Sequence, residues 1–366
     1  MPRSILCVNT GGAGDLHGLR MRRLAERLSD ADLTFYDFDK TSRREASRDL
    51  MQMLRSRKWD LVYQESTGIG SGARMIQAAR SAQKQRYVVS SGDPISGFFK
   101  VTKGPAFAAP FAVYEKMLYR SSAGFIGWTP YLTGRALELG APRAVTVEGA
   151  VALDVFRPLP VSEKQAWREA HGIAKHHLVC GLVGSLIWIE RQNYSYGLEL
   201  VETLKRVKRT DVSVLIVGDG GGRKRLEESI PDSLRERVIF TGRIPEAEVV
   251  YAMNAMDIGF IPQSLDELGS YRLTTKMPEY LACGLPIAMS PVPGFFDYVG
   301  NAAGWALPPF HPADPRFHNQ CAAWLDTLSG EEIAQKAACC RAIAESRFSY
   351  KMVGSRFASF VEGVLA

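Results

Sequence analysis

The strongest constraint on the fold is a regular alternation of short apolar runs with amphipathic stretches. In the first half, runs rich in Val, Ile, Phe and Tyr occupy residues 4–9, 33–38, 60–64, 87–90, 124–128 and 144–147. Stretches with helical periodicity, such as residues 16–28 and 43–54, lie between them. Strands that alternate with helices at this spacing form right-handed βαβ units around a buried parallel sheet. The pattern therefore predicts an α/β fold.

The alternation breaks at residues 156–160 (FRPLP) and then starts again. We expect strands at 178–186, 212–217, 238–241, 258–261 and 286–290, with helices at 196–208 and 278–283. A length of 366 residues also favours two domains. We predict two Rossmann-like, doubly wound parallel-sheet domains, joined near Pro158, that face each other across a ligand-binding cleft.

Composition excludes several other classes of protein. Hydrophobic residues make up 46% of the chain and charged residues 23%, which is typical of globular proteins and not of disordered, collagenous or coiled-coil chains. The six cysteines show neither a CxxC pair nor a nearby histidine at zinc spacing, so we expect no metal site and no disulfide framework. No apolar run is long enough for a signal peptide or a spanning helix, which predicts a cytoplasmic chain, soluble or peripheral on the membrane.

The net charge of +6 is unevenly distributed. Up to Arg157 there are 23 Lys and Arg against 15 Asp and Glu, whereas the rest has 22 against 24. The predicted N-terminal helices contain many of these cations: Arg20, Arg22, Arg23, Arg27, Arg43, Arg44, Arg48, Arg55, Arg57 and Lys58. Such charge is either a solvated helix face or an attraction for an anionic membrane. No recognised nucleic-acid motif accompanies it, so nucleic acid is disfavoured.

Residues 98–119 combine aromatic side chains with lysines and contain no acidic residue before Glu115. Segments of this composition lie in membrane interfaces, where apolar side chains enter the headgroup region and lysines attract anionic lipid. An ordinary helix packed on the sheet is the alternative.

Glycine-rich loops follow several of the predicted strands. The first, at residues 10–14 (TGGAG), opens a helix, where backbone N–H groups bind phosphate or carboxylate unless the loop is merely a tight turn. It is not a dinucleotide fingerprint of short-chain dehydrogenases, because His17 stands where the third glycine belongs. His17 is also the histidine nearest to a catalytic position. The second half has glycines after three strands, at Gly184, Gly218 and Gly242.

The most specific stretch is residues 272–291 (RLTTKMPEYLACGLPIAMSP). Arg272 and Lys276, together with Thr274 and Thr275, form a predicted helix N-terminus suited to a diphosphate. Glu279 is placed to accept hydrogen bonds from ribose hydroxyls, or serves only as a favourable partner of the helix dipole.

This stretch resembles the donor-binding signature of retaining family-4 glycosyltransferases, the glycosyl transferases group 1 of the GT-B fold, whose common form is S-P-x-K-x-x-E-Y-x-A-x-G-x-P. Six positions match in register: Lys276, Glu279, Tyr280, Ala282, Gly284 and Pro286. Further similarities are Gly11-Gly12, residues 152–158, Gly184, residues 217–220, Gly242 and the Phe348-Ser349-Tyr350 before a last helix that crosses back to the first domain. The resemblance implies domains at 1–160 and 161–345 and a crossing helix at 346–366.

The chain also departs from the family pattern. Tyr271 stands where the family often has a first Glu that contacts the donor sugar, and Glu267 is an off-register substitute. Arg191 is the candidate clamp for the diphosphate, or a surface charge. Where the family often has a histidine after the fourth strand, the chain has Asp93 before a proline, which orients an acceptor or donor hydroxyl, or serves in a turn.

The resemblance implies transfer of a sugar from a UDP- or GDP-sugar to a hydroxyl acceptor, with retention and without metal or cofactor. Saccharide or lipid-linked acceptors and a role in cell-surface polysaccharide or glycoconjugate synthesis are the expected context. The acceptor-side candidates are Gly11, Gly12 and Asp93. The catalytic candidates are Asp93, Glu279, Arg191 and Lys276. The candidates for binding the nucleotide sugar are Gly12, Gly184, Ser185, Arg191, Gly218, Gly242, Arg243, Tyr271, Arg272, Thr274, Thr275, Lys276 and Glu279.

Two alternatives remain at this point. A sugar-nucleotide epimerase of the same fold needs acid and base groups in the cleft, which the sequence does not reveal. A non-catalytic two-domain sugar-binding protein is normally exported, and we expect no signal peptide here.

Overall fold

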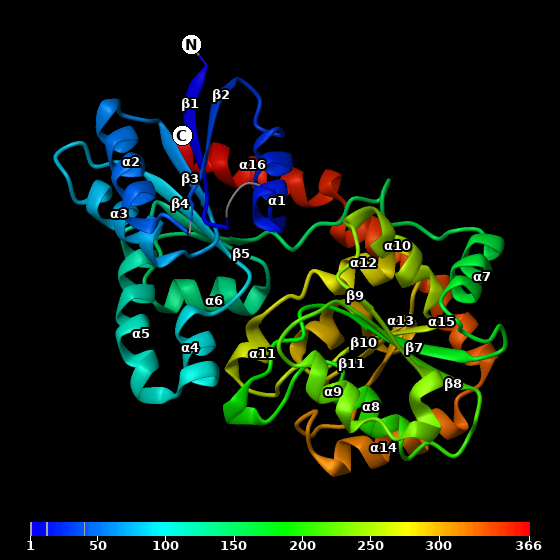
Figure 1. The fold of residues 1–366 in the computed structure, drawn as a ribbon. Helices are drawn as coiled ribbons and strands as arrows, with labels where there is room; N and C mark the ends of the chain where they lie inside the picture. Colours follow the sequence, from blue (N-terminus) through cyan, green and yellow to red (C-terminus); the bar gives the residue numbers. More distant parts are fainter. Residues whose placement is uncertain (1, 12–13, 40) are drawn as a thin grey trace. The chain divides into compact units, whose positions relative to one another are not determined.

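The computed structural model describes residues 2–11, 14–39 and 41–366, which form two compact units (Figure 1). The first unit extends to Ala150 and also contains Tyr271–Leu273 and Tyr350–Ala366. The second unit contains Val151–Ser270 and Thr274–Ser349. Each unit is built around its own six-stranded parallel sheet.

The first sheet has the strand order β2-β1-β3-β4-β5-β6. Its strands are β1 (Arg3–Asn9), β2 (Ala31–Asp37), β3 (Leu61–Glu65), β4 (Tyr87–Ser91), β5 (Gly124–Gly127) and β6 (Ala144–Thr146). The helices of this unit are α1 (Leu16–Ala25), α2 (Arg43–Ser56), α3 (Ile69–Ala79), α4 (Ile95–Lys103), α5 (Pro105–Arg120), α6 (Pro130–Glu138) and α16 (Tyr350–Leu365).

Alternation along the first strand divides the first core into two layers. Leu6 and Val8 belong to a cluster that includes Leu50 of α2 and Leu118 of α5, whereas Cys7 packs on the opposite side with α1 and α16. Successive residues of a strand point to opposite faces, so a strand covered on both faces is apolar throughout. The last helix, α16, thus completes the first unit, as the predicted crossing requires; Figure 1 shows it beside α1.

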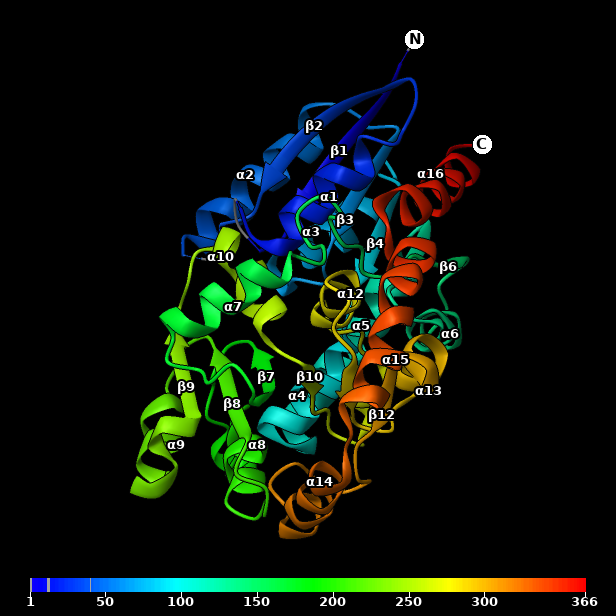
Figure 2. The ribbon, with the colours of Figure 1, turned by 90° about the vertical axis from the view of Figure 1, so that its right-hand side faces the viewer.

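The second sheet has the order β12-β11-β10-β7-β8-β9. Its strands are β7 (Leu178–Val183), β8 (Val212–Val217), β9 (Val238–Gly242), β10 (Ile258–Ile261), β11 (Ile287–Met289) and β12 (Gly304–Ala306). Its helices, most of them labelled in Figure 2, are α7 (Val161–Ala170), α8 (Leu198–Leu204), α9 (Arg223–Ser229), α10 (Glu246–Ala255), α11 (Glu267–Tyr271), α12 (Lys276–Ala282), α13 (Gly300–Ala303), α14 (Pro315–Thr327) and α15 (Gly330–Ile343). Short turns of other helix types lie at Glu190–Gln192, Asp232–Arg237, Phe295–Val299 and Ala344–Phe348.

The units divide at Ala150, ten residues before the boundary expected from the sequence. The segment after Ala150 packs on the second unit, because Arg341 donates hydrogen bonds to the carbonyls of Leu153 and Phe156. Asn254 likewise accepts from the backbone N–H of Leu159. The proline-rich break in the sequence is therefore part of the second unit's surface rather than the boundary itself.

No helix of the described residues is both long and apolar enough to cross a bilayer.

Candidate functional site

The second sheet reverses its strand order between β7 and β10, and ligands of open α/β sheets bind at such a switch point, beyond the carboxyl ends of the strands. A small pocket lies there. Its lining residues come from the ends of β7 and β10 and from the segment before α12: Leu182, Val183, Tyr196, Phe260, Ile261, Pro262, Gln263, Thr274 and Lys276. Two of the predicted donor-binding residues, Thr274 and Lys276, thus line a pocket at the position where the fold favours a ligand.

Lys276 begins α12 and lies across the end of β7. A Cβ atom on Gly184 would come within 2.9 Å of the Lys276 Cε atom, so the lysine side chain packs directly over this glycine. The Lys276 Nζ atom also lies 5.6 Å from the ring centroid of Tyr196. Tyr280 fixes α12 against the strand, since its hydroxyl accepts a hydrogen bond of 2.9 Å from the backbone N–H of Val183.

The predicted glycines after β7, β8 and β9 lie together, and their role is close backbone packing. A Cβ atom on Gly218 would lie 1.9 Å from the carbonyl oxygen of Gly184, and Gly218 has a φ of +136°. The Gly218 N–H donates to the carbonyl of Gly242 at 3.0 Å. These contacts hold three loops side by side at one edge of the sheet.

Glu279 lies in the first turn of α12 and is partly exposed. Desolvation raises the pKa of its carboxyl group to about 7, although the charge of Lys276 opposes the shift. A carboxylate with this pKa changes its hydrogen-bonding capacity within the physiological range.

Several other predicted donor residues lie outside this pocket's lining. Ser185, Arg191 and Arg243 are exposed on loops after β7 and β9. Thr275 is the residue before α12, and its hydroxyl does not cap the helix. Glu267 begins α11.

Tyr271 and Arg272 belong to the first unit, whereas Thr274 and the rest of the predicted donor segment belong to the second. The Tyr271 carbonyl accepts a hydrogen bond of 2.7 Å from the hydroxyl of Thr129. Arg272 forms an ion pair with Asp93, with 2.9 Å between Nε and Oδ1. A predicted donor residue and a predicted acceptor residue are thus partners of each other.

In the first unit, the sheet reverses its order between β1 and β3. Gly12 lies outside the described residues. Gly11 has a structural role in the loop after β1: a Cβ atom there would fall 1.2 Å from a carboxylate oxygen of Asp15, which caps α1 by accepting from the Gly18 N–H. The Gly11 N–H in turn donates to the Asn9 side chain.

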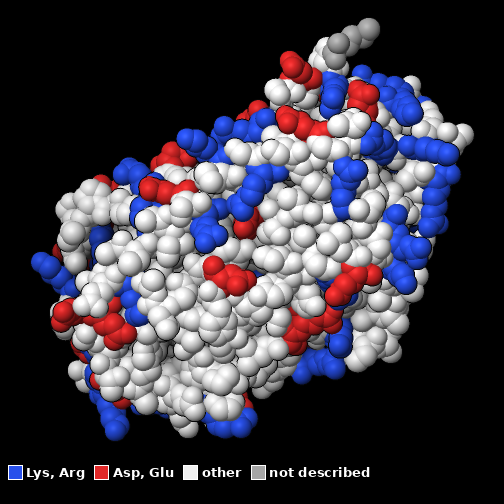
Figure 3. Space-filling model, turned by 180° about the vertical axis from the view of Figure 1, so that it is seen from behind, with Lys and Arg blue, Asp and Glu red and all other residues white. Residues whose placement is uncertain are grey.

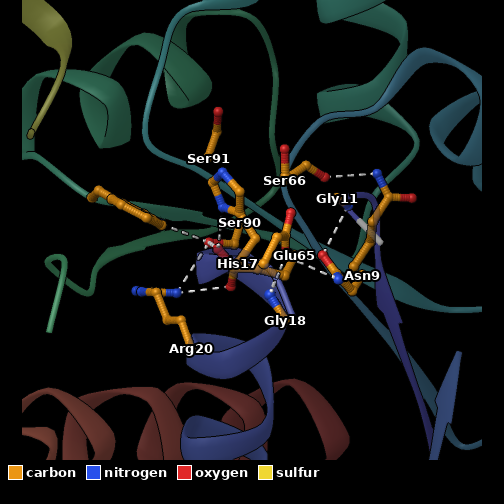
Figure 4. Close-up of polar contacts among 12 residues, drawn as sticks. Asn9, Gly11, His17, Gly18, Arg20, Glu65, Ser66, Ser90 and Ser91 are labelled. Carbon is orange, nitrogen blue, oxygen red and sulfur yellow. Dashed lines mark hydrogen bonds and ion pairs between the residues drawn. The ribbon is translucent and has the colours of Figure 1, made fainter. Parts of the chain in front are cut away.

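A buried polar cluster lies beside this loop, at the carboxyl ends of β3, β4 and β5 (Figure 4). Glu65, the last residue of β3, is fully buried and pairs with Arg20 of α1 at 2.8 Å. It also accepts hydrogen bonds from the hydroxyls of Tyr63 and Ser90. The indole N–H of Trp128 donates to the Ser90 hydroxyl.

Arg20 is central to this cluster. Its guanidinium group also donates to the carbonyls of Val147 and Glu148 and lies 4.6 Å from the Trp128 ring centroid. Burial raises the pKa of the Glu65 carboxyl group, but the positive charge of Arg20 together with His17 and the hydrogen bond from Tyr63 holds the pKa below its ordinary value. Glu65 is therefore an ionised carboxylate.

His17 joins the cluster from the first turn of α1. Its Nδ1 atom is buried and lies 3.9 Å from Oε1 of Glu65, and its ring packs 5.6 Å from Trp128 between centroids. The sequence indicates His17 only as the histidine nearest to a catalytic position, and it does not single out Glu65 or Gln263. Glu65 and Gln263 are polar residues at the ends of apolar strands, and this pattern is the signal that could have identified them. Only the strand order, however, shows which strand ends lie beside a switch point.

Among residues 2–11, 14–39 and 41–366, no group of three or more His, Cys, Asp or Glu side chains is arranged to hold a metal ion.

Residues 177–321, which lie within the second unit, match the family model of glycosyl transferases group 1. The chain is 30% identical over 192 residues to a 2-deoxystreptamine glucosyltransferase of Streptomyces kanamyceticus. This match covers 51% of this chain and 47% of that protein. It is 36% identical over 95 residues to a 2-deoxystreptamine N-acetyl-D-glucosaminyltransferase of Streptomyces fradiae, covering 26% of this chain and 21% of that protein. The matches thus span less than half the length of each relative.

Solved structures share the fold over nearly the whole chain. HepE of Anabaena, in complex with UDP and glucose, superposes with a TM-score of 0.76 at 16% identity, covering 99% of this chain and 100% of that one. Sucrose-phosphate synthase of Thermosynechococcus elongatus superposes with a TM-score of 0.79 at 15% identity, covering 99% of both chains. The chain has the GT-B fold, with a Rossmann-like strand order in its second unit, and the predicted fold class is confirmed.

Proposed function

We propose that this protein is a retaining glycosyltransferase that transfers a sugar from a UDP- or GDP-sugar to a hydroxyl acceptor. The observation that carries the proposal is the pocket at the switch point of the second sheet. It contains Lys276 and Thr274 from the signature segment, inside the region that matches glycosyl transferases group 1. The names of the relatives, which are glucosyl and N-acetylglucosaminyl transferases, support a nucleotide hexose as donor.

The chemical task is to stabilise the departing nucleoside diphosphate. As the bond between the anomeric carbon and the β-phosphate oxygen breaks, negative charge develops on that oxygen, and fixed cations lower the energy of this state. We assign this role to Lys276 and to Arg191, whose guanidinium group suits phosphate oxygens. These side chains take the place of a metal ion in the proposal, and Glu279 accepts hydrogen bonds from the ribose.

The proposal places the enzyme in the cytoplasm, with the first unit as the acceptor side. An epimerase is the competing activity of the same fold. The two differ in outcome, because an epimerase changes the sugar of its nucleotide sugar without a second substrate, whereas a transferase releases the nucleoside diphosphate.

Part of the proposal is that the first unit contacts an anionic membrane surface through the hairpin of α4 and α5. Phe98, Phe107 and Val113 are exposed on this hairpin, by 42%, 51% and 60% respectively. Lys100, Lys103, Lys116 and Arg120 are exposed as well. Glu115, the one acidic residue of these two helices, is buried and paired with Arg135 at 3.0 Å, so the outer surface of the hairpin is apolar and basic only.

The basic helices contribute to that surface unequally. On α1, Arg20 is buried, Arg22 pairs with Asp37 and Arg23 packs on the ring of Tyr350. These arginines hold the unit together and do not form the solvated basic face considered from the sequence. The cations of α2 and its following loop, in contrast, are exposed: Arg43, Arg44, Arg48, Arg55, Arg57 and Lys58. Figure 3 shows Lys and Arg side chains along one edge of the first unit.

Replacing Lys276 with Ala tests the donor site. We expect the dissociation constant for UDP-glucose, measured by calorimetry, to rise at least tenfold, because a charge-assisted contact to the diphosphate is lost. The midpoint of thermal unfolding without ligand should stay within a few degrees, since Lys276 is a partly exposed residue. Unchanged affinity in the variant would contradict the site assignment.

Lys224→Ala is the matched control. Lys224 lies in the same unit, on α9, with its side chain 86% exposed, and its removal should leave UDP-glucose affinity unchanged. The affinities of the unmodified protein for GDP-mannose and dTDP-glucose, compared with that for UDP-glucose, show which nucleobase the donor carries. If no nucleotide sugar binds and none is cleaved, the glycosyltransferase proposal is wrong.

A further inference from the structure

The His17 side chain is held on one side by groups that the proposed donor chemistry does not use. Its Nδ1 atom has less than 1 Å² of exposed surface and faces the buried carboxylate of Glu65 at 3.9 Å. No other described side chain accepts or donates a hydrogen bond at Nδ1. The side chain as a whole is 36% exposed, so the exposed part is the rest of the ring and its stem.

The charge of Glu65 decides which ring nitrogen carries the proton. Glu65 is ionised and paired with Arg20, so its oxygens accept hydrogen bonds and cannot donate them. Such a carboxylate stabilises the neutral imidazole that carries its proton on Nδ1. The two ring nitrogens point in diverging directions, so Nε2 is left with a free lone pair directed away from Glu65.

The position of the ring is also fixed by its neighbours. Trp128 packs against it and is itself held by the hydrogen bond to Ser90, which also donates to Glu65. Figure 4 shows His17, Glu65 and Ser90 converging from α1, β3 and β4. The ring therefore stands beside the loop after β1, at the switch point of the first sheet, where an α/β unit binds its ligand.

We propose that His17 binds a hydroxyl group of the acceptor through Nε2, and that Glu65 acts through His17 as a positioning residue. The inference rests on the proposed function and names the acceptor chemistry of the first unit: a polyhydroxylated ring, of saccharide or aminocyclitol type, whose hydroxyl donates a hydrogen bond to Nε2. The gap of 3.9 Å between Nδ1 and Glu65 closes to hydrogen-bond length when the acceptor engages the ring, as often happens when a substrate completes a site.

The arrangement is tested first without any substrate, by the ¹⁵N resonances of the His17 ring above pH 8. The expected spectrum shows a proton on Nδ1 and none on Nε2. A Glu65→Gln variant, in which an amide replaces the carboxylate, should lose this preference if it folds. A ring protonated on Nε2 in the unmodified protein would overturn the inference.

Substrate binding is tested with His17→Phe, which keeps a ring against Trp128 but removes both nitrogens. With UDP-glucose as donor and 2-deoxystreptamine as acceptor probe, we expect transfer to fall at least tenfold through a higher acceptor KM. The dissociation constant for UDP should stay within twofold, because the donor pocket lies in the second unit. His176→Phe, an exposed histidine of the second unit, is the matched control and should change neither quantity.

The two proposals fail in different ways. A His17→Phe variant that transfers glucose as fast as the unmodified protein overturns the role of His17 but leaves the glycosyltransferase proposal intact. A protein that neither binds UDP-glucose nor transfers glucose from it refutes the proposed function, and the acceptor role of His17 with it.

Discussion

At the scale of single residues, two carboxyl groups, one in each unit, have pKa values shifted in opposite directions. Glu65 is buried beside Arg20, and the charge of this partner keeps its pKa low. Glu279 lies three residues after Lys276, but desolvation outweighs the charge of this lysine and raises the pKa of Glu279 to about 7. The first carboxylate is charged at neutral pH, while the second titrates near neutrality.

Nucleotide binding should therefore depend on pH through Glu279. If its carboxylate accepts hydrogen bonds from the ribose, the protonated form that prevails below pH 7 loses that capacity. We expect the affinity for UDP to increase with pH, by up to tenfold per unit below pH 7, and to level off above it. Calorimetry between pH 5.5 and pH 8.5 measures this dependence.

Glu279→Gln provides the comparison, since the amide does not titrate. The titration of UDP itself is common to both proteins, so the difference between their profiles isolates Glu279. Parallel profiles would show that this carboxylate does not contact the nucleotide.

At the scale of elements, the loops after β7, β8 and β9 support one another through backbone contacts. The Gly184 N–H donates to the carbonyl of Val217, and the Gly218 N–H donates to that of Gly242. Glycine at these positions permits the close approach, so the loop arrangement depends on residues without side chains.

Gly218→Ala should be strongly destabilising, because the new methyl group would lie 1.9 Å from the Gly184 carbonyl oxygen at a φ that L-residues rarely adopt. We expect a loss of about 2–3 kcal/mol in the free energy of unfolding, measured by urea denaturation. Gly221→Ala in the same loop is the control: a Cβ atom there meets nothing within 4 Å, and stability should hardly change. Equal effects of the two substitutions would contradict this explanation.

At the scale of the whole molecule, the basic excess of the sequence is only partly a surface property. The arginines of α1 are used inside the first unit, in contacts with β3 and α16. Exposed cations include those of α2 and those of the α4–α5 hairpin, where exposed phenylalanines accompany them. This combination is the basis of the proposed membrane contact.

The membrane proposal predicts sedimentation with vesicles that contain phosphatidylglycerol, and not with vesicles of phosphatidylcholine alone. Replacing both Phe98 and Phe107 with Ser should reduce the bound fraction at least fivefold, because apolar surface is lost from the contact. Binding should also weaken as salt is raised, since the lysine contribution is screened.

Phe296→Ser is the matched control for this experiment. Phe296 is 64% exposed but belongs to the second unit, so its loss should not affect vesicle binding. A wild-type protein that stays in solution with anionic vesicles would rule out the membrane contact.

The sequence by itself determined the fold class and most of the strands. The apolar period of the strands and the glycines and prolines between elements act locally. Eleven of the twelve strands in the described residues could therefore be placed to within three residues at each end from residue type alone. The short strand β12 (Gly304–Ala306) was missed because its sequence, Gly-Trp-Ala, contains no β-branched residue, whereas the equally short β6 and β11 contain Val, Thr or Ile. The signature segment also predicted Lys276 and Thr274 as site residues, and both line the pocket of the second unit.

Only the tertiary structure decided which strand ends adjoin each other, and therefore which residues share a site. Strand order is set by packing between segments distant in sequence, so the pairing of His17 with Glu65, 48 positions later, has no local signal. The same holds for Arg272, whose partner Asp93 lies in a different part of the chain. The order of the strands in the sheet determines which side chains lie together at a site. That order in turn depends on packing that buries both faces of every strand at once.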